Sequence, residues 1–239
     1  MKIALFGYGK MGRSIEAVLI ERGHEVSARV DSKNPRESFD LSETDAIIEF
    51  SRPEYAVDNI QFAFSKGIPI VVGTTGWYDQ LSEVEYLCKS HNGSLLHATN
   101  FSLGVNVFFA LNEKLAEMMN GLEDYDTSML EIHHTEKLDA PSGTGISLAE
   151  QIIQRSDRYT KWANDFAENV KEDNVLPLAS KRESGVPGTH EVVYTSSIDT
   201  IEIKHTAHNR KGFALGSVIA AEWLKNKKGI FTMRDVLKI

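Results

Sequence analysis

The chain has few of the features that mark secreted, membrane and nucleic-acid-binding proteins. Its 239 residues include one cysteine, Cys88, so an intrachain disulfide is impossible and a reducing compartment is expected. No apolar run approaches the roughly 20 residues needed to span a bilayer. The apolar start, Met1–Phe6, is too short for a signal peptide. We therefore expect a cytoplasmic protein with no membrane partner.

Basic residues are also in deficit. Asp and Glu number 34 against 26 Lys and Arg, which gives a formal net charge of -8. Nucleic acid is therefore not an expected partner, because its phosphate backbone needs a basic face. Local basic pockets for small anions are still compatible with this balance.

The length allows one large domain or two smaller domains, each with its own hydrophobic core.

The first hundred residues carry a glycine motif between a predicted strand and a predicted helix. The apolar run Ile3–Phe6 suits a buried strand, and the helical pattern that follows ends near Gly23. Between them stands Gly7-Tyr8-Gly9-Lys10-Met11-Gly12. In G-x-G-x-x-G the glycines permit a tight turn, pyrophosphate approach and close helix packing. The next predicted strand, Glu25–Val30, ends at Asp31, where a dinucleotide fold places its ribose ligand.

Three further strand patterns, at 46–50, 69–72 and 94–97, alternate with helical patterns. That alternation predicts a parallel sheet with right-handed crossovers, whose ligands bind beyond the carboxyl ends of the strands. Small and polar residues gather at these ends, in Gly73-Thr74-Thr75-Gly76 and Ala98-Thr99-Asn100-Phe101. Ser51 is the expected N-cap of a helix with Pro53 in its first turn.

The second half has a different pattern. Periodicity predicts a helix from 103 to about 120, a strand over 125–132, a helix after Ser142 to about Arg155, strands over 189–196 and 200–207, and a helix over 213–224. Strands paired without an intervening helix indicate an antiparallel or mixed sheet. Subunit association is one way to cover such a sheet. Residues 158–184 predict a long surface connection, with a partly helical stretch around 161–170.

The segment richest in chemistry follows the strand over 125–132. It reads Glu131-Ile132-His133-His134-Thr135-Glu136-Lys137-Leu138-Asp139-Ala140-Pro141-Ser142-Gly143-Thr144-Gly145. Imidazoles exchange protons near neutral pH, and a lysine ammonium holds an anion. A helix that opens after Ser142 aims backbone N–H groups at an anion. The segment predicts an acid/base group beside a carboxylate pocket, although strand-end histidines and Ser-Gly-Thr caps are also common structural features.

Together these motifs resemble the dihydrodipicolinate reductase family, also called 4-hydroxy-tetrahydrodipicolinate reductase, of bacterial lysine and diaminopimelate biosynthesis. The carriers are Gly7–Gly12, Gly73–Gly76, Asn100–Ser102 with Gly104–Asn106, the run from Glu131 to Thr144, Gly188-x-His190-x-Val192 and the tail from Ala207 to Ala214. The resemblance covers nearly the whole chain except 158–184.

The resemblance implies an NAD(P)H-dependent oxidoreductase that reduces a small cyclic dicarboxylate. His133 would be the acid and Lys137 would assist it. The substrate carboxylates would be held by His134, Ser142, Gly143 and Thr144. The cofactor would be lined by Gly7, Tyr8, Gly9, Lys10, Met11, Gly12, Asp31, Gly73, Thr74, Thr75, Ala98, Thr99, Asn100 and Phe101. Arg210 would contribute to the substrate pocket or to a domain hinge.

The implied fold is α/β, with a Rossmann-type domain and an α+β domain built on a mixed sheet. Residues 1–102 with 212–239 would form the dinucleotide-binding domain, and 103–211 the substrate-binding and oligomerisation domain of a homotetramer. Relatives often carry a basic residue after the acidic one at the second strand. Here Asp31 is followed by Ser32, which favours NADH over NADPH, although Lys33 can partly reverse this.

Two other interpretations stay open. One is another two-domain nicotinamide oxidoreductase, such as an amino-acid dehydrogenase, which has no need for the histidine-rich segment. The other is a non-catalytic nucleotide sensor, or a metal-binding protein that uses His133, His134 and His190. Adjacent residues of a strand point to opposite faces, so His133 and His134 would not readily chelate one ion. No metal is therefore expected.

Overall fold

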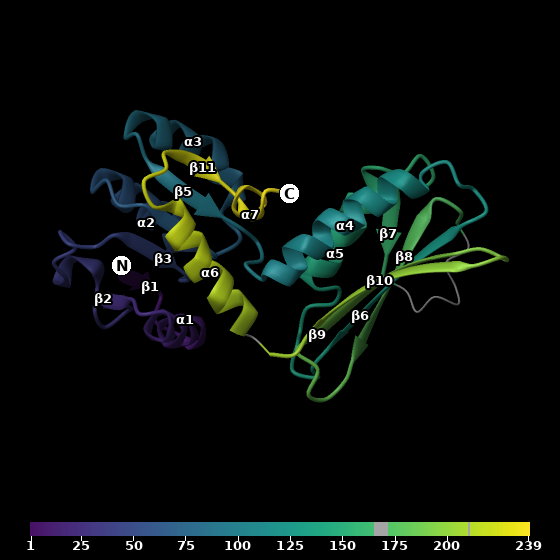
Figure 1. Cartoon of the computed structure of the whole chain (residues 1–239), viewed down its shortest axis with the longest axis horizontal. Helices are drawn as coiled ribbons and strands as arrows, with labels where there is room; N and C mark the ends of the chain where they lie inside the picture. The colour runs from purple at the N-terminus through teal and green to yellow at the C-terminus, as the bar shows by residue number, and fades with distance from the viewer. Residues whose placement is uncertain (165–171, 210) are drawn as a thin grey trace. The chain divides into compact units, whose positions relative to one another are not determined.

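The computed structural model describes residues 1–164, 172–209 and 211–239, which form two compact units (Figure 1). Unit 1 comprises Met1–Leu103 and Lys211–Ile239, and unit 2 comprises Gly104–Arg210. The predicted boundaries stood after residue 102 and before residue 212. Arg210 and most of the stretch expected to be partly helical lie outside the described residues. Across the part of the chain described, no helix has the length and hydrophobicity to cross a membrane.

Unit 1 is built on a six-stranded sheet in the order β11-β5-β4-β3-β1-β2. Its strands are β1 (Lys2–Phe6), β2 (Glu25–Val30), β3 (Ala46–Glu49), β4 (Ile70–Val72), β5 (Ser94–His97) and β11 (Gly229–Phe231). Every neighbouring pair is parallel, so all carboxyl ends share one edge. The predicted Rossmann-type sheet is confirmed. The short strand β11 was not predicted.

Helices cover both faces of this sheet. Two of them, α1 (Lys10–Glu21) and α6 (Lys211–Leu224), lie side by side on one face with α7 (Met233–Leu237). The other face carries α2 (Pro53–Ser65) and α3 (Leu81–Ser90). Alternate residues of β1 face the two layers, and a strand buried on both faces reads as one apolar run. Cys88 is buried in the α3 layer, where it packs with the hydrophobic core of that face.

Ser51 does not cap α2, contrary to the sequence prediction. The helix begins at Pro53 as expected, but its N-cap is Arg52, which makes no side-chain cap hydrogen bond. The Ser51 hydroxyl instead donates to the carboxylate of Glu49. Glu49 is fully buried at the end of β3, and a buried carboxylate needs donors. Ser51 therefore donates its hydroxyl hydrogen to the buried Glu49 carboxylate and does not cap α2.

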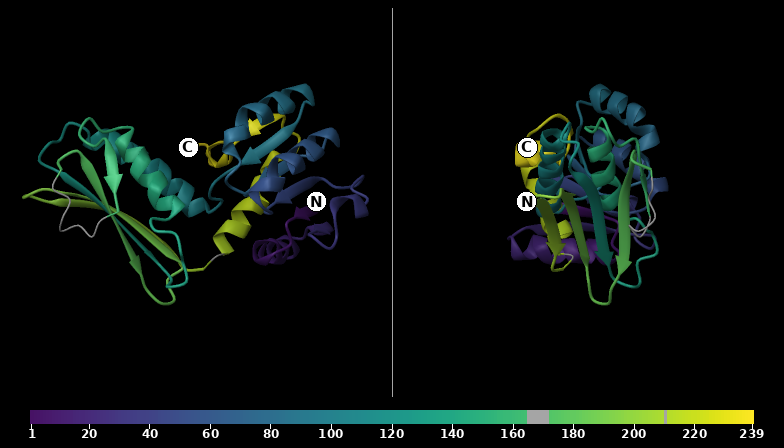
Figure 2. Two further views of the ribbon diagram at one scale, coloured as in Figure 1. Left: turned by 180° about the vertical axis from the view of Figure 1, so that it is seen from behind. Right: turned by 90° about the vertical axis from the view of Figure 1, so that its right-hand side faces the viewer.

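Unit 2 is built on a five-stranded mixed sheet in the order β10-β9-β6-β8-β7. Its strands are β6 (Asp126–His133), β7 (Lys161–Ala163), β8 (Val175–Arg182), β9 (Gly188–Thr195) and β10 (Thr200–Ala207). The central strand β6 is parallel to β8 and antiparallel to β9. Two helices, α4 (Leu103–Met119) and α5 (Gly143–Ile153), lie along one face and complete the core (Figures 1 and 2). The predicted mixed sheet is confirmed.

The surface connection predicted for residues 158–184 is wrong at two places, where the chain forms strands of the sheet. Lys161–Ala163 forms β7, and Val175–Arg182 forms β8, an internal strand of the sheet. Leu176 and Leu178 are fully buried. Pro177 stands between them, and a proline inside a short run argues against a strand. The second half of β8 is polar, so the alternation of apolar and polar residues that marks a strand is not visible there.

Leu178→Ala is expected to lower the free energy of unfolding by about 2–5 kcal/mol, because it leaves a cavity in the core of unit 2. Urea denaturation followed by circular dichroism measures the change. Lys181→Ala is the control, since this exposed side chain of the same strand should contribute less than about 0.5 kcal/mol. A small effect of both substitutions would show that β8 does not belong to the core.

Candidate active site

The three glycines of the N-terminal motif have different surroundings. Gly7 has a φ of 96°, and a Cβ there would lie 2.1 Å from the carbonyl oxygen of Phe50. A Cβ on Gly12 would lie 2.4 Å from the carbonyl oxygen of Gly7. A Cβ on Gly9 would meet nothing within 4 Å. Close packing within the protein therefore requires Gly7 and Gly12, whereas Gly9 leaves room for an approaching ligand.

A cavity of about 710 Å³ lies at this edge of unit 1. Its walls come from the glycine motif (Gly7, Tyr8, Gly9), the end of β2 (Asp31, Ser32), the following turn (Arg36, Glu37) and the start of α2 (Arg52, Tyr55). Asp31 accepts hydrogen bonds from the backbone N–H groups of Lys33 and Asn34, both at 2.9 Å. These bonds lower the pKa of Asp31, so its carboxylate is charged at neutral pH.

The charges of the cavity are mostly negative or already paired. Arg36 lies 2.8 Å from Asp58 and 2.9 Å from Glu37. Arg52 is the other cation, with a side chain that is 74% exposed and lies 3.8 Å from Glu54. Asp31 thus stands as a carboxylate among acidic groups. Such surroundings suit a ribose hydroxyl better than an additional phosphate.

The other residues predicted to line the cofactor differ in how far their side chains are buried. Lys10, Thr75 and Thr99 are exposed, and Tyr8, Met11, Gly73 and Ala98 are half-buried. Thr74, Asn100 and Phe101 are buried. The Thr74 hydroxyl accepts from the backbone N–H of Ser51 at 2.9 Å, and the Asn100 amide oxygen accepts from that of Ser102 at 2.8 Å. Phe101 belongs to the hydrophobic core. These three side chains shape the edge of the sheet from inside.

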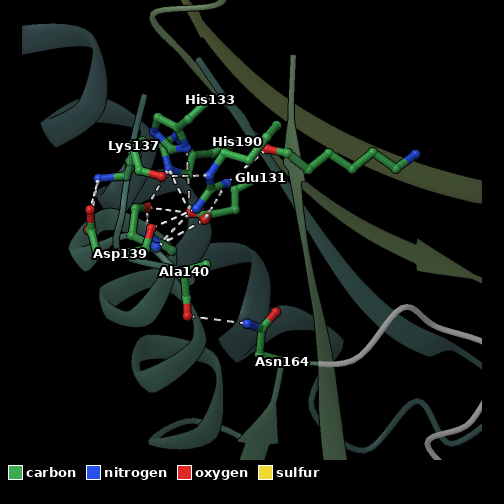
Figure 3. Close-up of polar contacts among 11 residues, drawn as sticks. Glu131, His133, Lys137, Asp139, Ala140, Asn164 and His190 are labelled. Carbon is green, nitrogen blue, oxygen red and sulfur yellow. Dashed lines mark hydrogen bonds and ion pairs between the residues drawn. The ribbon is translucent and has the colours of Figure 1, made fainter. Parts of the chain in front are cut away.

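In unit 2, the central strand presents a buried group of ionisable side chains (Figure 3). His133 is the last residue of β6 and is 7% exposed, whereas His134 is half-buried. Glu131 lies on the same face of β6 as His133, because it precedes it by two residues. His190 is the partner of Glu131 on β9. We call Glu131, His133 and His190 the Glu131 cluster.

The distances within the Glu131 cluster are short. The Glu131 Oε2 atom lies 3.8 Å from His133 Nδ1 and 3.7 Å from His190 Nε2. The two imidazole rings are 5.1 Å apart between centroids and meet edge to face. Neither the role of Glu131 nor the position of His190 beside the acid was predicted from the sequence. The period-2 spacing of Glu131 and His133 on one strand was the available signal.

Both imidazoles are held neutral in unit 2. Burial lowers the pKa of His133, an effect that the charge of Glu131 opposes. Burial lowers the pKa of His190 to about 3, and His133, His205 and Lys137 add to the shift. The neutral form is favoured because a cation is costly to bury. A ligand that brings negative charge to His133 would favour its protonation.

The loop after β6 holds the predicted lysine. The Lys137 Nζ atom lies 2.8 Å from both carboxylate oxygens of Asp139, and this pairing lowers the pKa of Asp139. Arg182, from β8, donates to the carbonyl oxygens of Lys137 at 3.3 Å and Asp139 at 2.6 Å. Arg182 lies in the stretch wrongly predicted as a surface connection, so its role in holding this loop was not predicted.

Ser142 caps α5, which is the structural alternative that the sequence left open beside substrate binding. Its hydroxyl oxygen accepts from the backbone N–H of Gly145 at 3.0 Å, and its hydroxyl hydrogen goes to Glu131. Its own backbone N–H donates to both Glu131 oxygens at 3.0 Å. Ser142 is 3% exposed, so its polar groups serve the interior. Gly143 is exposed and Thr144 half-buried at the start of the helix.

The Glu131 cluster also has the composition of a metal site. Each member offers one ligand atom, and these atoms lie within 4.8 Å of one another. The structure thus brings together two of the three histidines named from sequence, His133 and His190, and adds Glu131 in place of His134. Ser142 already donates to Glu131, and Arg182 Nη1 lies 3.7 Å from its Oε1 atom. The carboxylate is therefore supplied with donors and a nearby cation by the protein itself.

Comparisons with known proteins give one consistent family. Residues 1–101 match the family profile described as dihydrodipicolinate reductase, N-terminus, and residues 104–237 match the profile described as its C-terminus. A curated relative from Christiangramia forsetii, a 4-hydroxy-tetrahydrodipicolinate reductase, is 51% identical over 237 residues. The alignment covers 99% of this chain and 98% of that relative.

Solved structures share the fold. A dipicolinate-bound dihydrodipicolinate reductase from Paenisporosarcina sp. TG-14 matches with a TM-score of 0.74 and 20% identity, over 97% of each chain. A DAP dehydrogenase from C. glutamicum, in complex with DAP, matches with a TM-score of 0.51 and 15% identity, over 100% of this chain and 93% of that one. At such identities the likeness concerns the fold alone, so the amino-acid dehydrogenase alternative gains only a shared architecture.

The stability of unit 2 is expected to depend on pH through His190. Its pKa of about 3 in the folded protein lies below its ordinary value of 6.5, so below pH 6.5 the unfolded chain binds a proton that the folded protein does not. Stability should therefore fall as the pH drops from 6.5 towards 3, with His190 contributing about 1.4 kcal/mol per pH unit.

His190→Gln should reduce that pH dependence by the same amount, because glutamine does not titrate. Urea denaturation at a series of pH values measures the slope. His91→Gln is the matched control, since His91 is exposed and should leave the slope as in the natural sequence. Equal slopes for the natural protein and His190→Gln would contradict the assignment of a buried neutral His190.

Proposed function

Because the chain belongs to the dihydrodipicolinate reductase family, we propose that it reduces 4-hydroxy-tetrahydrodipicolinate to tetrahydrodipicolinate with NAD(P)H, in lysine and diaminopimelate biosynthesis. The observation that carries this function is the 51% identity to a curated reductase over 99% of the chain. The reaction adds a hydride to the ring and a proton to the neighbouring carbon, with loss of water from the hydroxylated substrate.

Unit 1 is proposed to bind the cofactor. When bound, a reduced nicotinamide supplies the hydride. Gly9 fits the pyrophosphate, because an approaching group meets open space there, and the backbone N–H groups at the start of α1 favour an anion. Asp31 would accept a hydrogen bond from a ribose hydroxyl. The remaining predicted residues of the edge would line the same site directly or support it from inside.

The cavity charges support NADH as the preferred cofactor. Asp31 is charged, and Glu37 and Asp58 stand in the same cavity. The 2′-phosphate of NADPH would add negative charge next to them. Arg36 is already paired with Glu37 and Asp58, and Arg52, the other cation of the cavity, is exposed and has only a longer contact of 3.8 Å, with Glu54. The protein would then bind NADPH more weakly than NADH.

Unit 2 is proposed to bind and protonate the substrate. Lys137 and His134 would hold the substrate carboxylates with the start of α5, where Gly143 and Thr144 follow the Ser142 cap. A substrate carboxylate would replace Asp139 as the partner of Lys137. His133 would supply the proton. Two substrate carboxylates would also favour the imidazolium form of His133, which burial alone disfavours.

A homotetramer in the cytoplasm completes the proposal. Leu130, Ile132 and Val193 alternate with the core residues of β6 and β9, so they face away from α4 and α5 and are only half-buried. An apolar sheet face of this kind suits contact with another subunit. A light-scattering mass equal to one chain would contradict the oligomer. The support for the cellular location is the sequence composition alone.

A metal-binding role for the Glu131 cluster is the second candidate function. The three ligand atoms within 4.8 Å of one another favour it. Elemental analysis of the purified protein separates the two candidates. An ion at one per chain, retained on dialysis, would support the metal role, whereas the reductase proposal requires no metal.

His133→Gln is expected to lower turnover about 10²–10⁴-fold, because it removes the proposed acid. The assay supplies freshly made product of dihydrodipicolinate synthase with NADH and follows loss of the reduced cofactor's absorbance. Cofactor affinity, measured by fluorescence titration, should stay nearly unchanged because His133 belongs to unit 2. His91→Gln serves as the control and should match the natural protein.

Lys137→Ala should raise KM as well as slow turnover, since the lysine would contact the substrate directly.

Losses of equal size in turnover and in cofactor affinity for His133→Gln would contradict the acid assignment. An unchanged KM in Lys137→Ala would show that this lysine does not contact the substrate.

Asp31→Asn is expected to shift the cofactor preference towards NADPH. Removal of the charge weakens the hydrogen bond to the ribose and removes the repulsion of a 2′-phosphate. The ratio of kcat/KM for NADH to that for NADPH should fall roughly tenfold or more. Asp40→Asn, an exposed turn residue outside the cavity, is the control. A ratio that stays the same in Asp31→Asn would remove Asp31 from the cofactor site.

A further inference from the structure

The loop between β6 and α5 carries an ion pair of its own. The Lys137 Nζ atom lies 2.8 Å from each carboxylate oxygen of Asp139, two residues further along the chain. Figure 3 shows the ammonium directed at that carboxylate. The same ammonium is the group proposed to hold a substrate carboxylate. The protein therefore supplies the lysine with a carboxylate that a ligand carboxylate would have to replace.

The backbone of this loop is held by hydrogen bonds that do not involve the Asp139 carboxylate. Arg182 donates to the carbonyl oxygens of Lys137 at 3.3 Å and Asp139 at 2.6 Å. The Asn164 side chain donates to the carbonyl oxygen of Ala140 at 3.2 Å. These contacts fix the main chain on both sides of the ion pair. The Asp139 side chain can therefore leave the lysine by rotation alone, while the backbone stays in place.

The two side chains of the ion pair differ in exposure. The Lys137 side chain is 21% exposed, whereas the Asp139 side chain is 61% exposed. A carboxylate at such a position regains its hydration when it turns outward, and the lysine stays against the protein. An ion pair with an exposed partner contributes little free energy. A ligand carboxylate, which offers the same chemistry, can therefore take the place of Asp139 at small cost.

The loop contains a second acidic residue next to the lysine. Glu136 directly precedes Lys137, and its side chain is exposed. Among the residues of this loop that the structure describes, the ion pair of Lys137 is with Asp139. The two acids thus lie within two residues of the lysine, and they differ in the direct contact. A comparison of their substitutions separates that contact from a general effect of negative charge.

A substrate with two carboxylates has the means to displace Asp139. The start of α5, at Gly143 and Thr144, is proposed to hold one of the two. That anchor presents the other carboxylate to Lys137 at a high effective concentration, as the short stretch of chain does for Asp139. An anion with a single carboxylate has no such anchor, so it competes for the lysine at its bulk concentration alone.

We infer that Asp139 is an internal competitor of the substrate: its carboxylate occupies Lys137, and a substrate carboxylate takes its place on binding. The exchange replaces one ion pair by another and transfers no proton or electron. It weakens the binding of substrate and product alike, so it raises KM and shortens the time for which the product stays bound. This inference rests on the proposed function, since it takes Lys137 as a ligand of the substrate.

The test removes the charge of Asp139 and keeps its shape, by Asp139→Asn in the full-length protein. Calorimetry with saturating NADH measures the Kd of pyridine-2,6-dicarboxylate, an unreactive ring that carries two carboxylates. The Kd should fall roughly two- to fivefold, the range expected when an exposed ion pair no longer competes. The KM of the substrate should fall by a similar factor while kcat is not reduced, because the competitor acts on binding rather than on the chemical step.

Three further variants separate the direct contact from charge in general. Glu136→Gln removes the same charge from the same loop and should change Kd less, because salt screens an exposed charge that makes no contact. Asp139→Ala also removes the amide that could still accept from Lys137, so its fall in Kd should be equal or larger. In a Lys137→Ala background, Asp139→Asn should leave Kd unchanged, because the carboxylate then has no lysine to occupy.

A Kd that rises in Asp139→Asn would show that the carboxylate positions Lys137 for the substrate, and an unchanged Kd would show that the two carboxylates do not compete. Either result overturns the inference. A fall of the same size in Glu136→Gln, or in the Lys137→Ala background, would also overturn it, since the effect would then be one of charge in general.

The binding measurement needs no turnover, so it distinguishes this inference from the proposed function. A protein without reductase activity whose Asp139→Asn variant binds the dicarboxylate more tightly would lose the proposed function and keep the inference. An active protein whose variant has an unaltered Kd would lose the inference alone.

Discussion

A carboxylate that water cannot reach must be surrounded by donors, and Glu131 imposes that requirement on unit 2. Glu131 is completely buried in β6, and Ser142 donates hydrogen bonds to it from its backbone N–H and its hydroxyl. The helix α5 therefore starts beside β6, and the loop that carries Lys137 must close between them. The site is thus organised around one desolvated charge, whose cost is offset by hydrogen bonds rather than by exposure.

Unit 1 is under a different constraint, because the sheet edge at the carboxyl ends of its strands has to leave space for a ligand. Gly7 and Gly12 let the backbone of β1, β3 and α1 approach closely, while Gly9 keeps the surface open. In the proposed function, the choice between NADH and NADPH depends on the charges around Asp31 rather than on a buried ion. The two halves of the proposed reaction, hydride supply and protonation, therefore rest on separate physical devices in separate units.

Sequence patterns predicted elements well where the apolar period was local and complete. The strand, glycine turn and helix at the start of the chain are confirmed, as are the parallel sheet of unit 1 and the helix that begins after Ser142. The pattern failed at β8, where Pro177 and a polar second half conceal a core strand. It also failed at Ser51, because the hydroxyl serves the buried Glu49 rather than α2.

The sequence by itself determined the fold class, the dinucleotide motif and the segment from Glu131 to Thr144, because each is a pattern of neighbouring residues. Only the tertiary structure decided which groups surround His133. His190 and Arg182 come from strands far along the chain, and they reach Glu131 through the pairing of β6 with β9 and β8. Such pairing depends on the packing of the whole sheet, which no local period in the sequence records.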